Sequence, residues 1–337
     1  MSTRNIYISY LRVMATIAVV AIHASTGFLN LFNAYSFDWN YANWINSFLR
    51  CSVPIFVAIS GILLLHKEEN TLTFYKKRIG KILPPFIFWT IVYIFYLLIR
   101  VRNIDQLSWD TIFNTILQKV LTGANAHLWY LYMIIGLYLA IPFIRKFVVN
   151  ARIKDIEYFL AIWFLASFLK FPLIKEYTPN IDLSFFTGYL GYLVLGYYIS
   201  IKDINWPKSL WIYLYLISAT ITALMTFYLS SQHQKYDPTF YNYLTPNTII
   251  CTAAIIFFSK KLWSEKIKTP KWVELIDRYS FGIYLIHIIP LNYLHPICST
   301  YLHSSLVVPC VTILTVVCSA NLIYLLRLIP GGKYISG

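Results

Sequence analysis

Long apolar segments alternate with short polar loops along the whole chain. Several of these segments are close to 20 residues long, which is the length that a helix needs to cross the hydrocarbon of a bilayer. The expected fold class is therefore all-α, a polytopic transmembrane bundle of about ten spans. The pattern predicts them at about 7–28, 44–65, 82–100, 128–146, 156–172, 185–201, 209–229, 246–262, 281–298 and 305–327.

The composition and charge of the chain agree with a membrane protein. Hydrophobic residues make up 58% of the 337 residues and charged residues only 12%, whereas soluble proteins carry about 25% charged residues. With both termini in the cytoplasm, the inner loops hold 20 of the 28 Lys and Arg residues and the outer loops six, as the positive-inside rule requires. This distribution indicates contact with the lipid bilayer rather than with nucleic acid, despite a net charge of +14. No linker divides residues 1–337, and we expect one integral membrane domain.

The cysteines and histidines do not predict a metal site. Five dispersed cysteines lie mostly in apolar segments without metal-ligand spacing, and no carboxylate lies close in sequence to His23, His127 or His287. Free thiols are favoured over a Cys298–Cys310 disulfide.

One segment outside the spans, residues 105–122, has apolar residues at helical spacing. Ser108 or Asp105 is placed to cap such a helix. We expect an amphipathic helix on the outer face of the membrane.

Arg12 and His23 are the most informative polar residues, because both fall inside the first apolar segment. Eleven helical steps make three full turns and about 20°, so the two side chains share one face, about 16 Å apart along the axis. This spacing excludes direct contact between them on a regular helix. Each side chain either snorkels to the headgroups or faces protein or a water-filled cavity. In a cavity, His23 is the leading base, because its ordinary pKa is closest to neutral.

Polar and small residues also mark the second segment. Arg50 lies a few residues into it, as an interfacial anchor or as part of a polar cavity. Pro54 removes a backbone hydrogen bond, and Ser60 with Gly61 offers small residues for close helix approach. Packing accounts for these features, and a cavity lining is the functional alternative.

A basic group follows the second segment at Lys77, Arg78 and Lys81, where the next helix is expected to start. Ordinary positive-inside charge explains this group. The functional alternative is a site for the phosphates of a cytoplasmic nucleotide-like donor, since the guanidinium fork of arginine suits phosphate oxygens.

Two further polar groups lie in the fourth and ninth segments. His127 and Trp129 open the fourth segment at the outer face, where an aromatic belt and a solvated histidine are the simple interpretation. Ser280, Tyr284 and His287 lie at i, i+4 and i+7 and form one polar stripe on the ninth segment. The stripe either joins helices by hydrogen bonds or lines a cavity, and its histidine favours the cavity.

Together these motifs resemble the integral membrane acyltransferase family 3, and within it the stand-alone surface-glycan O-acetyltransferases. Two positions depart from the family pattern. Ser9 stands where an acidic residue often precedes the signature arginine by three, and Lys81 stands where arginine is common. The likeness covers essentially the whole chain and rests on Arg12-(ten residues)-His23, Arg50 with Pro54-Ile55-Phe56 and Ser60-Gly61, Arg78-x-x-Lys81, His127-Leu128-Trp129-Tyr130-Leu131 and Ser280-x-x-x-Tyr284-x-x-His287.

The resemblance implies a multi-pass enzyme of the bacterial cell membrane. Such an enzyme moves an acyl group, usually acetyl from cytoplasmic acetyl-CoA, to a hydroxyl of a cell-surface or lipid-linked glycan. Arg12 and His23 are its implied catalytic residues, and Arg78 and Lys81, with the neighbouring Lys77, its donor-binding residues. The acyl-CoA is a substrate, and no permanently bound cofactor or metal is implied. Residues expected to bind substrate or to line the cavity are Arg50, Ser60, His127, Trp129, Ser280, Tyr284 and His287.

Other functions stay open at this point. A transporter or flippase of glycan or lipid-linked intermediates would use the same polar cavity for passage. An O-succinyltransferase would use the same chemistry with another donor, and a scaffolding membrane protein would need neither. The sequence leaves the acceptor hydroxyl and the oligomeric state open.

Overall fold

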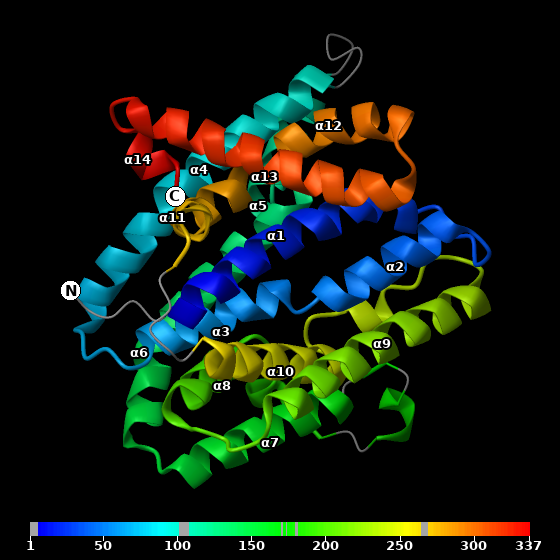
Figure 1. Ribbon diagram of the computed structural model, residues 1–337. Helices are drawn as coiled ribbons and strands as arrows, with labels where there is room; N and C mark the ends of the chain where they lie inside the picture. The colour runs from blue at the N-terminus through cyan, green and yellow to red at the C-terminus, as the bar shows by residue number, and fades with distance from the viewer. Residues whose placement is uncertain (1–5, 101–107, 170, 173, 179–180, 264–268) are drawn as a thin grey trace. The chain divides into compact units, whose positions relative to one another are not determined.

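The computed structural model describes residues 6–100, 108–169, 171–172, 174–178, 181–263 and 269–337 (Figure 1). Over these residues the chain is helical and has no strand, so the predicted all-α class is confirmed. Short 3-10 turns lie at Ala126–Leu128, Lys175–Tyr177, Ser184–Phe186 and Thr239–Tyr241. The helices are α1 (Ile6–Leu29), α2 (Phe37–Leu49), α3 (Ser52–Leu64), α4 (Thr71–Arg100), α5 (Trp109–Thr122), α6 (Trp129–Asn150), α7 (Ile153–Leu169), α8 (Leu190–Ile201), α9 (Lys208–His233), α10 (Pro246–Leu262), α11 (Lys271–Ile286), α12 (Ile288–Tyr301), α13 (Ser304–Leu328) and α14 (Gly332–Ile335).

The chain divides into two compact units. Unit 1 comprises Met1–Lys67 and Arg145–Ala320, and it contains α1 to α3, α7 to α12 and most of α13. Unit 2 comprises Glu68–Ile144 and Asn321–Gly337, and it contains α4, α5, most of α6 and α14. The expectation of one integral membrane domain stays a prediction.

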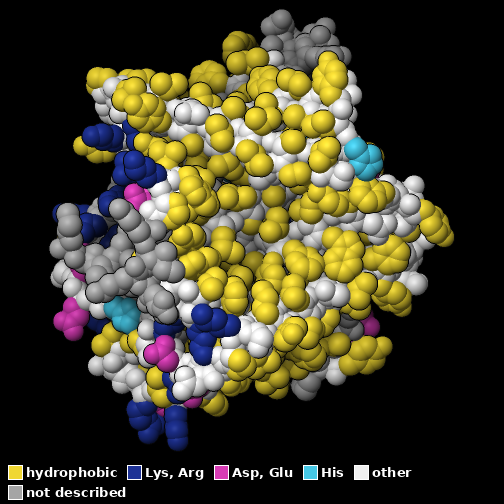
Figure 2. All heavy atoms as spheres, in the orientation of Figure 1, with side chains coloured by type: hydrophobic (Ala, Val, Ile, Leu, Met, Phe, Trp, Pro, Cys, Tyr) yellow, Lys and Arg dark blue, Asp and Glu magenta, His cyan; other side chains and the backbone are white. Residues whose placement is uncertain are grey.

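Six spans in the described part of the chain are long and apolar enough to cross a membrane, and the bent pair of α11 and α12 makes a seventh if it is one span. Hydrophobic side chains cover most of the face seen in Figure 2. The segments predicted at 156–172, 185–201 and 246–262 do form helices, but α7, α8 and α10 have only 17, 12 and 17 residues. The predicted number of ten spans is therefore not confirmed. The six are Ile6–Leu29, Phe37–Leu64, Thr71–Arg100, Ala126–Asn150, Lys208–His233 and Ser304–Leu328.

Two segments expected to be single helices are interrupted beside a proline. The second segment is α2 followed by α3, and Pro54 has no N–H to donate to the carbonyl of Arg50 at the break. The ninth segment bends by 80° between α11 and α12 at His287, and Pro290 likewise cannot donate four residues back. Each interruption places a polar candidate, Arg50 or His287, at a helix end.

In unit 1, α3 and α8 pack backbone to backbone. A Cβ on Gly61 would lie 2.0 Å from the carbonyl oxygen of Leu193, and one on Gly196 would lie 2.0 Å from that of Ala58. Only glycine permits this approach from both sides. The packing interpretation of residues 52–61 is thereby supported. The neighbouring helices α9 and α10 also lie side by side in this unit (Figure 1).

In unit 2, α4 begins at Thr71 and therefore includes the basic group that was expected at a helix start. The helix at 109–122 is capped as predicted, because the backbone N–H of Thr111 donates to Ser108 Oγ at 3.2 Å. Asp105, the other predicted cap, lies outside the described residues. The Trp89 indole donates to the carbonyl of Ile335 at 3.0 Å and joins α4 to α14.

Candidate active site

Arg12 on α1 forms an ion pair with Asp277 on α11. The Asp277 side chain is completely buried, whereas that of Arg12 retains 26% of its exposure. Ser9, one turn earlier on α1, donates its hydroxyl to the second carboxylate oxygen at 2.8 Å. A buried carboxylate is stable when it is paired and hydrogen-bonded, and Arg12 and Ser9 meet both needs.

Asp277 is a candidate site residue that was not predicted from the sequence. It lies three residues before Ser280, so it extends the stripe of Ser280, Tyr284 and His287 by one turn. The stripe was assigned to a span starting at 281, whereas α11 begins at Lys271. Helical spacing carried back from Ser280 is the signal that would have found it.

His23 lies beside His287, with 5.1 Å between the ring centroids and 47° between the ring planes. His287 is completely buried, and its Nδ1 lies 2.6 Å from the carbonyl oxygen of Tyr284. Because a carbonyl only accepts, Nδ1 carries the hydrogen, and the lone pair of a neutral His287 ring is on Nε2. The helix end at His287 thus fixes the tautomer of this ring.

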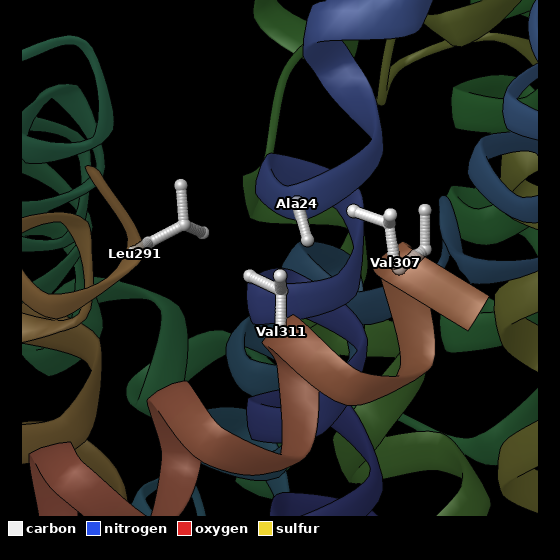
Figure 3. Close-up of a cluster of buried hydrophobic side chains, with 5 residues drawn as sticks. Ala24, Leu291, Val307 and Val311 are labelled. Carbon is white, nitrogen blue, oxygen red and sulfur yellow. The ribbon is translucent and has the colours of Figure 1, made fainter. Parts of the chain in front are cut away.

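A buried apolar cluster holds the chain next to the two histidines. Ala24 follows His23 on α1 and packs with Leu291 of α12 and with Val307 and Val311 of α13 (Figure 3). The cluster secures α12 against α1 just after the bend, so the position of His287 beside His23 depends on packing from three helices.

The two contacts show how α1 and α11 are aligned. Arg12 contacts Asp277 near the start of α1. His23 lies eleven residues after Arg12, and it contacts His287, which lies ten residues after Asp277 at the end of α11. The helices therefore run side by side in the same direction. We name Arg12, Asp277, His23 and His287 the α1–α11 row. As expected from the spacing, the ion pair and the histidine pair are separate contacts.

Arg50 is held by the loop between α9 and α10. Its Nε donates to the carbonyl of Tyr241 at 2.7 Å, and its guanidinium lies 4.8 Å from the ring centroids of both Tyr241 and Tyr243. Burial raises the pKa of the Tyr241 hydroxyl, so the cation faces a neutral ring. Tyr241, which holds Arg50, also packs with Leu29 at the end of α1 that carries His23.

The other unit 1 candidates separate into two groups. Ser280 and Tyr284 are buried with the row: Ser280 Oγ donates to the carbonyl of Asp277 at 3.0 Å, and the Tyr284 ring lies 5.9 Å from that of His287. Ser60 instead donates to the carbonyl of Phe56 within α3 at 3.1 Å. This contact belongs to the packing segment rather than to the row.

The remaining candidates lie in unit 2. Lys77, Arg78 and Lys81 follow one another in the first turns of α4. Lys77 pairs with Glu69, and Arg78 Nε has no hydrogen-bond partner among the described residues. The resemblance assigns these cations to the donor, and that role stays a prediction.

His127 and Trp129 lie where the polypeptide enters α6. His127 is buried rather than solvated, with Nδ1 3.1 Å from Asn125 Oδ1 and its ring edge-on to Tyr93 at 5.1 Å. The simple interpretation of a solvated histidine is therefore wrong. Trp129 packs edge-on against Tyr130 at 6.4 Å.

The described residues contain no group of three His, Cys, Asp or Glu side chains placed to hold a metal ion. All five cysteines are described, and each is a free thiol. The chemistry of the row is therefore that of a guanidinium, a carboxylate and two imidazoles. Such a set can bind an anionic or polar ligand at one end and move a proton at the other.

Comparison with known proteins identifies the family. A model of the acyltransferase 3 family, described as an acyltransferase domain, matches residues 5–324. The comparisons with curated proteins and with solved structures find no match. The matched residues include the α1–α11 row and the basic group of α4, and they cover nearly the whole chain. The chain therefore belongs to the acyltransferase 3 family and is a membrane acyltransferase.

Proposed function

We propose that the protein transfers an acetyl group from cytoplasmic acetyl-CoA to a hydroxyl of a cell-surface or lipid-linked glycan. The α1–α11 row is the observation that carries this proposal. It combines an ion-paired guanidinium with a histidine whose neighbour has a fixed tautomer. A flippase needs a polar path, but it has no use for a positioned base.

His23 is the proposed general base. It takes the proton of the acceptor hydroxyl while the hydroxyl oxygen attacks the thioester carbonyl. A C–O bond forms, the C–S bond breaks, and the departing CoA thiolate takes the proton from His23. His287 supports this role because its Nε2 lone pair can accept a hydrogen bond from the protonated His23 ring. A relay of the acyl group through His23 would use the same residues.

Arg12 has a different proposed task, because about 16 Å of regular helix separates it from His23. At that distance it cannot contact a carbonyl that reacts beside His23. It would instead hold the pantetheine arm or the pyrophosphate of the donor. The guanidinium has more N–H donors than one carboxylate uses, and part of its side chain stays exposed for such a contact. Asp277 would fix its orientation.

The basic group of α4 would bind the phosphates of the donor. Arg78 offers a guanidinium fork, and Lys77 and Lys81 add positive charge on the same helix. Lys81 in place of arginine removes one bidentate partner, so we expect weaker phosphate binding than two arginines would provide. Two observations support this role. One is the family resemblance, and the other is that Arg78 Nε is buried without a hydrogen-bond partner among the described residues.

The test uses the full chain in lipid nanodiscs with labelled acetyl-CoA and the lipid-linked and surface glycans of the host. We expect mass spectrometry to detect an acetylated glycan with the wild type. A His23→Ala variant should lose about 100-fold or more of the rate, the usual contribution of a general base. His303→Ala, which removes an exposed histidine, should behave as the wild type. Full acetylation by His23→Ala would overturn the assignment, and succinyl transfer in its place would correct the donor.

A further inference from the structure

A cavity of about 470 Å³ lies in unit 1, between the end of α7, the chain before α8 and the loop that precedes α10. Its volume falls in the range of small-molecule sites, about 300–1,000 Å³. The residues of the row do not line it, so it is a separate feature. Lining residues used in the argument are Trp163, Ser167, Phe171, Thr187, Asn242 and Thr245.

The lining combines aromatic rings with hydroxyl and amide groups. Among the described residues that line the cavity, none is charged. Aromatic surface with a few convergent neutral hydrogen-bonding groups fits an uncharged polar ligand with apolar C–H faces. A sugar ring has that character. Among the described residues of this lining, a uronate or a phosphorylated sugar would find no counter-charge, which is costly.

The wall formed by Trp163 is rigid. Its indole donates to the carbonyl of Gly188 at 3.1 Å and meets the ring of Tyr192 edge-on at 4.9 Å. Gly191 packs so closely that a Cβ there would lie 2.0 Å from the indole. A ring that is fixed in advance binds a ligand with little loss of conformational entropy.

The loop between α9 and α10 connects the cavity with the candidate active site. Thr239, Asn242 and Thr245 of this loop line the cavity, and Tyr241 and Tyr243 between them hold Arg50. The Tyr241 ring also packs with Leu29 at the end of α1, the end that carries His23. A ligand in the cavity therefore touches the same loop that positions Arg50.

We propose that this cavity binds an uncharged pyranose unit of the acceptor glycan. The role of that sugar as acceptor rests on the proposed function, whereas its binding does not. A sugar bound there contacts the loop between α9 and α10, and this loop in turn contacts Arg50 and the end of α1. It also assigns a substrate class: neutral hexoses and their N-acetyl derivatives, in preference to anionic sugars.

Filling the cavity provides the test. Ser167 lines it from α7, and its hydroxyl donates to the carbonyl of Phe164 within its own helix. Ser167→Ala keeps the space and Ser167→Trp fills it. Ala161→Trp is the matched control, because it adds the same indole at an exposed position of α7. Leu244→Trp fills the cavity from the loop and serves if Ser167→Trp does not fold.

Binding and transfer are measured separately in nanodiscs. Saturation-transfer NMR uses a panel of methyl glycosides (glucoside, galactoside, mannoside and N-acetylglucosaminide) and methyl glucuronide as the anionic probe. We expect at least one neutral glycoside to bind the wild type, Ser167→Ala and Ala161→Trp, with at least tenfold weaker binding to the filled variants. In the transfer assay the filled variants should raise the acceptor KM tenfold or more and leave the acetyl-CoA KM unchanged.

The outcomes separate the two proposals. Binding that the filled variants abolish, without acetyl transfer by any variant, would support the sugar site and contradict the acetyltransferase assignment. Transfer with an acceptor KM that the filled variants leave unchanged would place the acceptor elsewhere and overturn the inference. So would a preference for glucuronide, or no binding of any neutral glycoside to the wild type.

Discussion

Asp277 supplies the negative charge that the Arg12 guanidinium needs within an apolar bundle, and it does so from a distant part of the chain. The expected acidic position on α1 holds Ser9 instead, yet Ser9 still contacts this carboxylate by donating to it. The Ser9 hydroxyl and the Arg12 guanidinium thus both contact the Asp277 carboxylate. The sequence predicted that Arg12 and His23 share a face, since that depends only on local periodicity. It could not reveal a pairing that joins residues 265 positions apart.

An Asp277→Asn variant should therefore lose activity and stability together. The amide keeps the shape but leaves the guanidinium without its counter-charge. We expect a loss of roughly 3 kcal/mol in the free energy of unfolding, at the low end for a broken buried pair because Arg12 is partly exposed. Thermal unfolding in nanodiscs and the acetyl-CoA KM are the measurements.

Ser9→Asp on the Asp277→Asn background is the matched rescue. It returns the acid three residues before Arg12, where the two side chains can pair on one helix. Recovery of thermal stability and of the acetyl-CoA KM is expected. If stability recovers without the KM, the carboxylate must act from α11 and the positioning role described above is wrong.

Two helix interruptions shape the site at the scale of elements. Pro54 and Pro290 each withhold a backbone donor, and the breaks that follow place Arg50 and His287 at helix ends. Both prolines are visible in the sequence. Hydropathy and length predicted one span for each segment. Phe37–Leu64 does count as one span, whereas the apolar window over α11 and α12 did not reveal their bend. The 80° angle at His287 depends on packing against α1 and α13, which local sequence does not encode.

The contact of α3 with α8 gives a prediction for a single methyl group. Gly61→Ala would place its Cβ on the Leu193 carbonyl, so the helices must separate. We expect a loss of about 1–3 kcal/mol, the usual cost of overpacking, seen as a lower unfolding temperature.

Gly136→Ala is the control for this variant, because a Cβ at Gly136 has no neighbour within 4 Å. Alanine favours a helix over glycine by about 1 kcal/mol, so this variant should be unchanged or slightly more stable. Equal behaviour of the two variants would mean that α3 and α8 are not in backbone contact.

The chain divides into two compact units, and the expectation of one integral membrane domain stays a prediction. The catalytic candidates and the cavity lie in unit 1, and the proposed donor group lies in unit 2. Composition identified the membrane class, because charged residues are too few to cover a water-facing surface. It did not separate helices long enough to cross a membrane from shorter buried apolar helices such as α8, since both are apolar.

The predicted topology can be tested at the two ends of α9. Lys208 begins this 26-residue helix, Lys235 lies just after its end at His233, and both lysines are exposed. The positive-inside rule puts Lys208 in the cytoplasm and Lys235 outside. In a cysteine-free background, an impermeant maleimide should label Lys235→Cys in intact cells and Lys208→Cys only after permeabilisation. The reverse pattern would invert the whole topology, including the side from which acetyl-CoA enters.

The ion pair of Arg12 with Asp277 also constrains the order of biosynthesis. Ribosomes add about 5–20 residues per second, so roughly 15–50 s pass between the synthesis of the guanidinium and that of its carboxylate 265 residues later. During this time α1 carries a cation that the bilayer disfavours, and the headgroups or the insertion machinery have to accommodate it. Helix α1 can take its final position only after α11 has been synthesised, because Asp277 lies on α11. Helix α1 is therefore made early but settles only after α11, and a nascent chain that stops before Asp277 leaves the Arg12 guanidinium without its carboxylate.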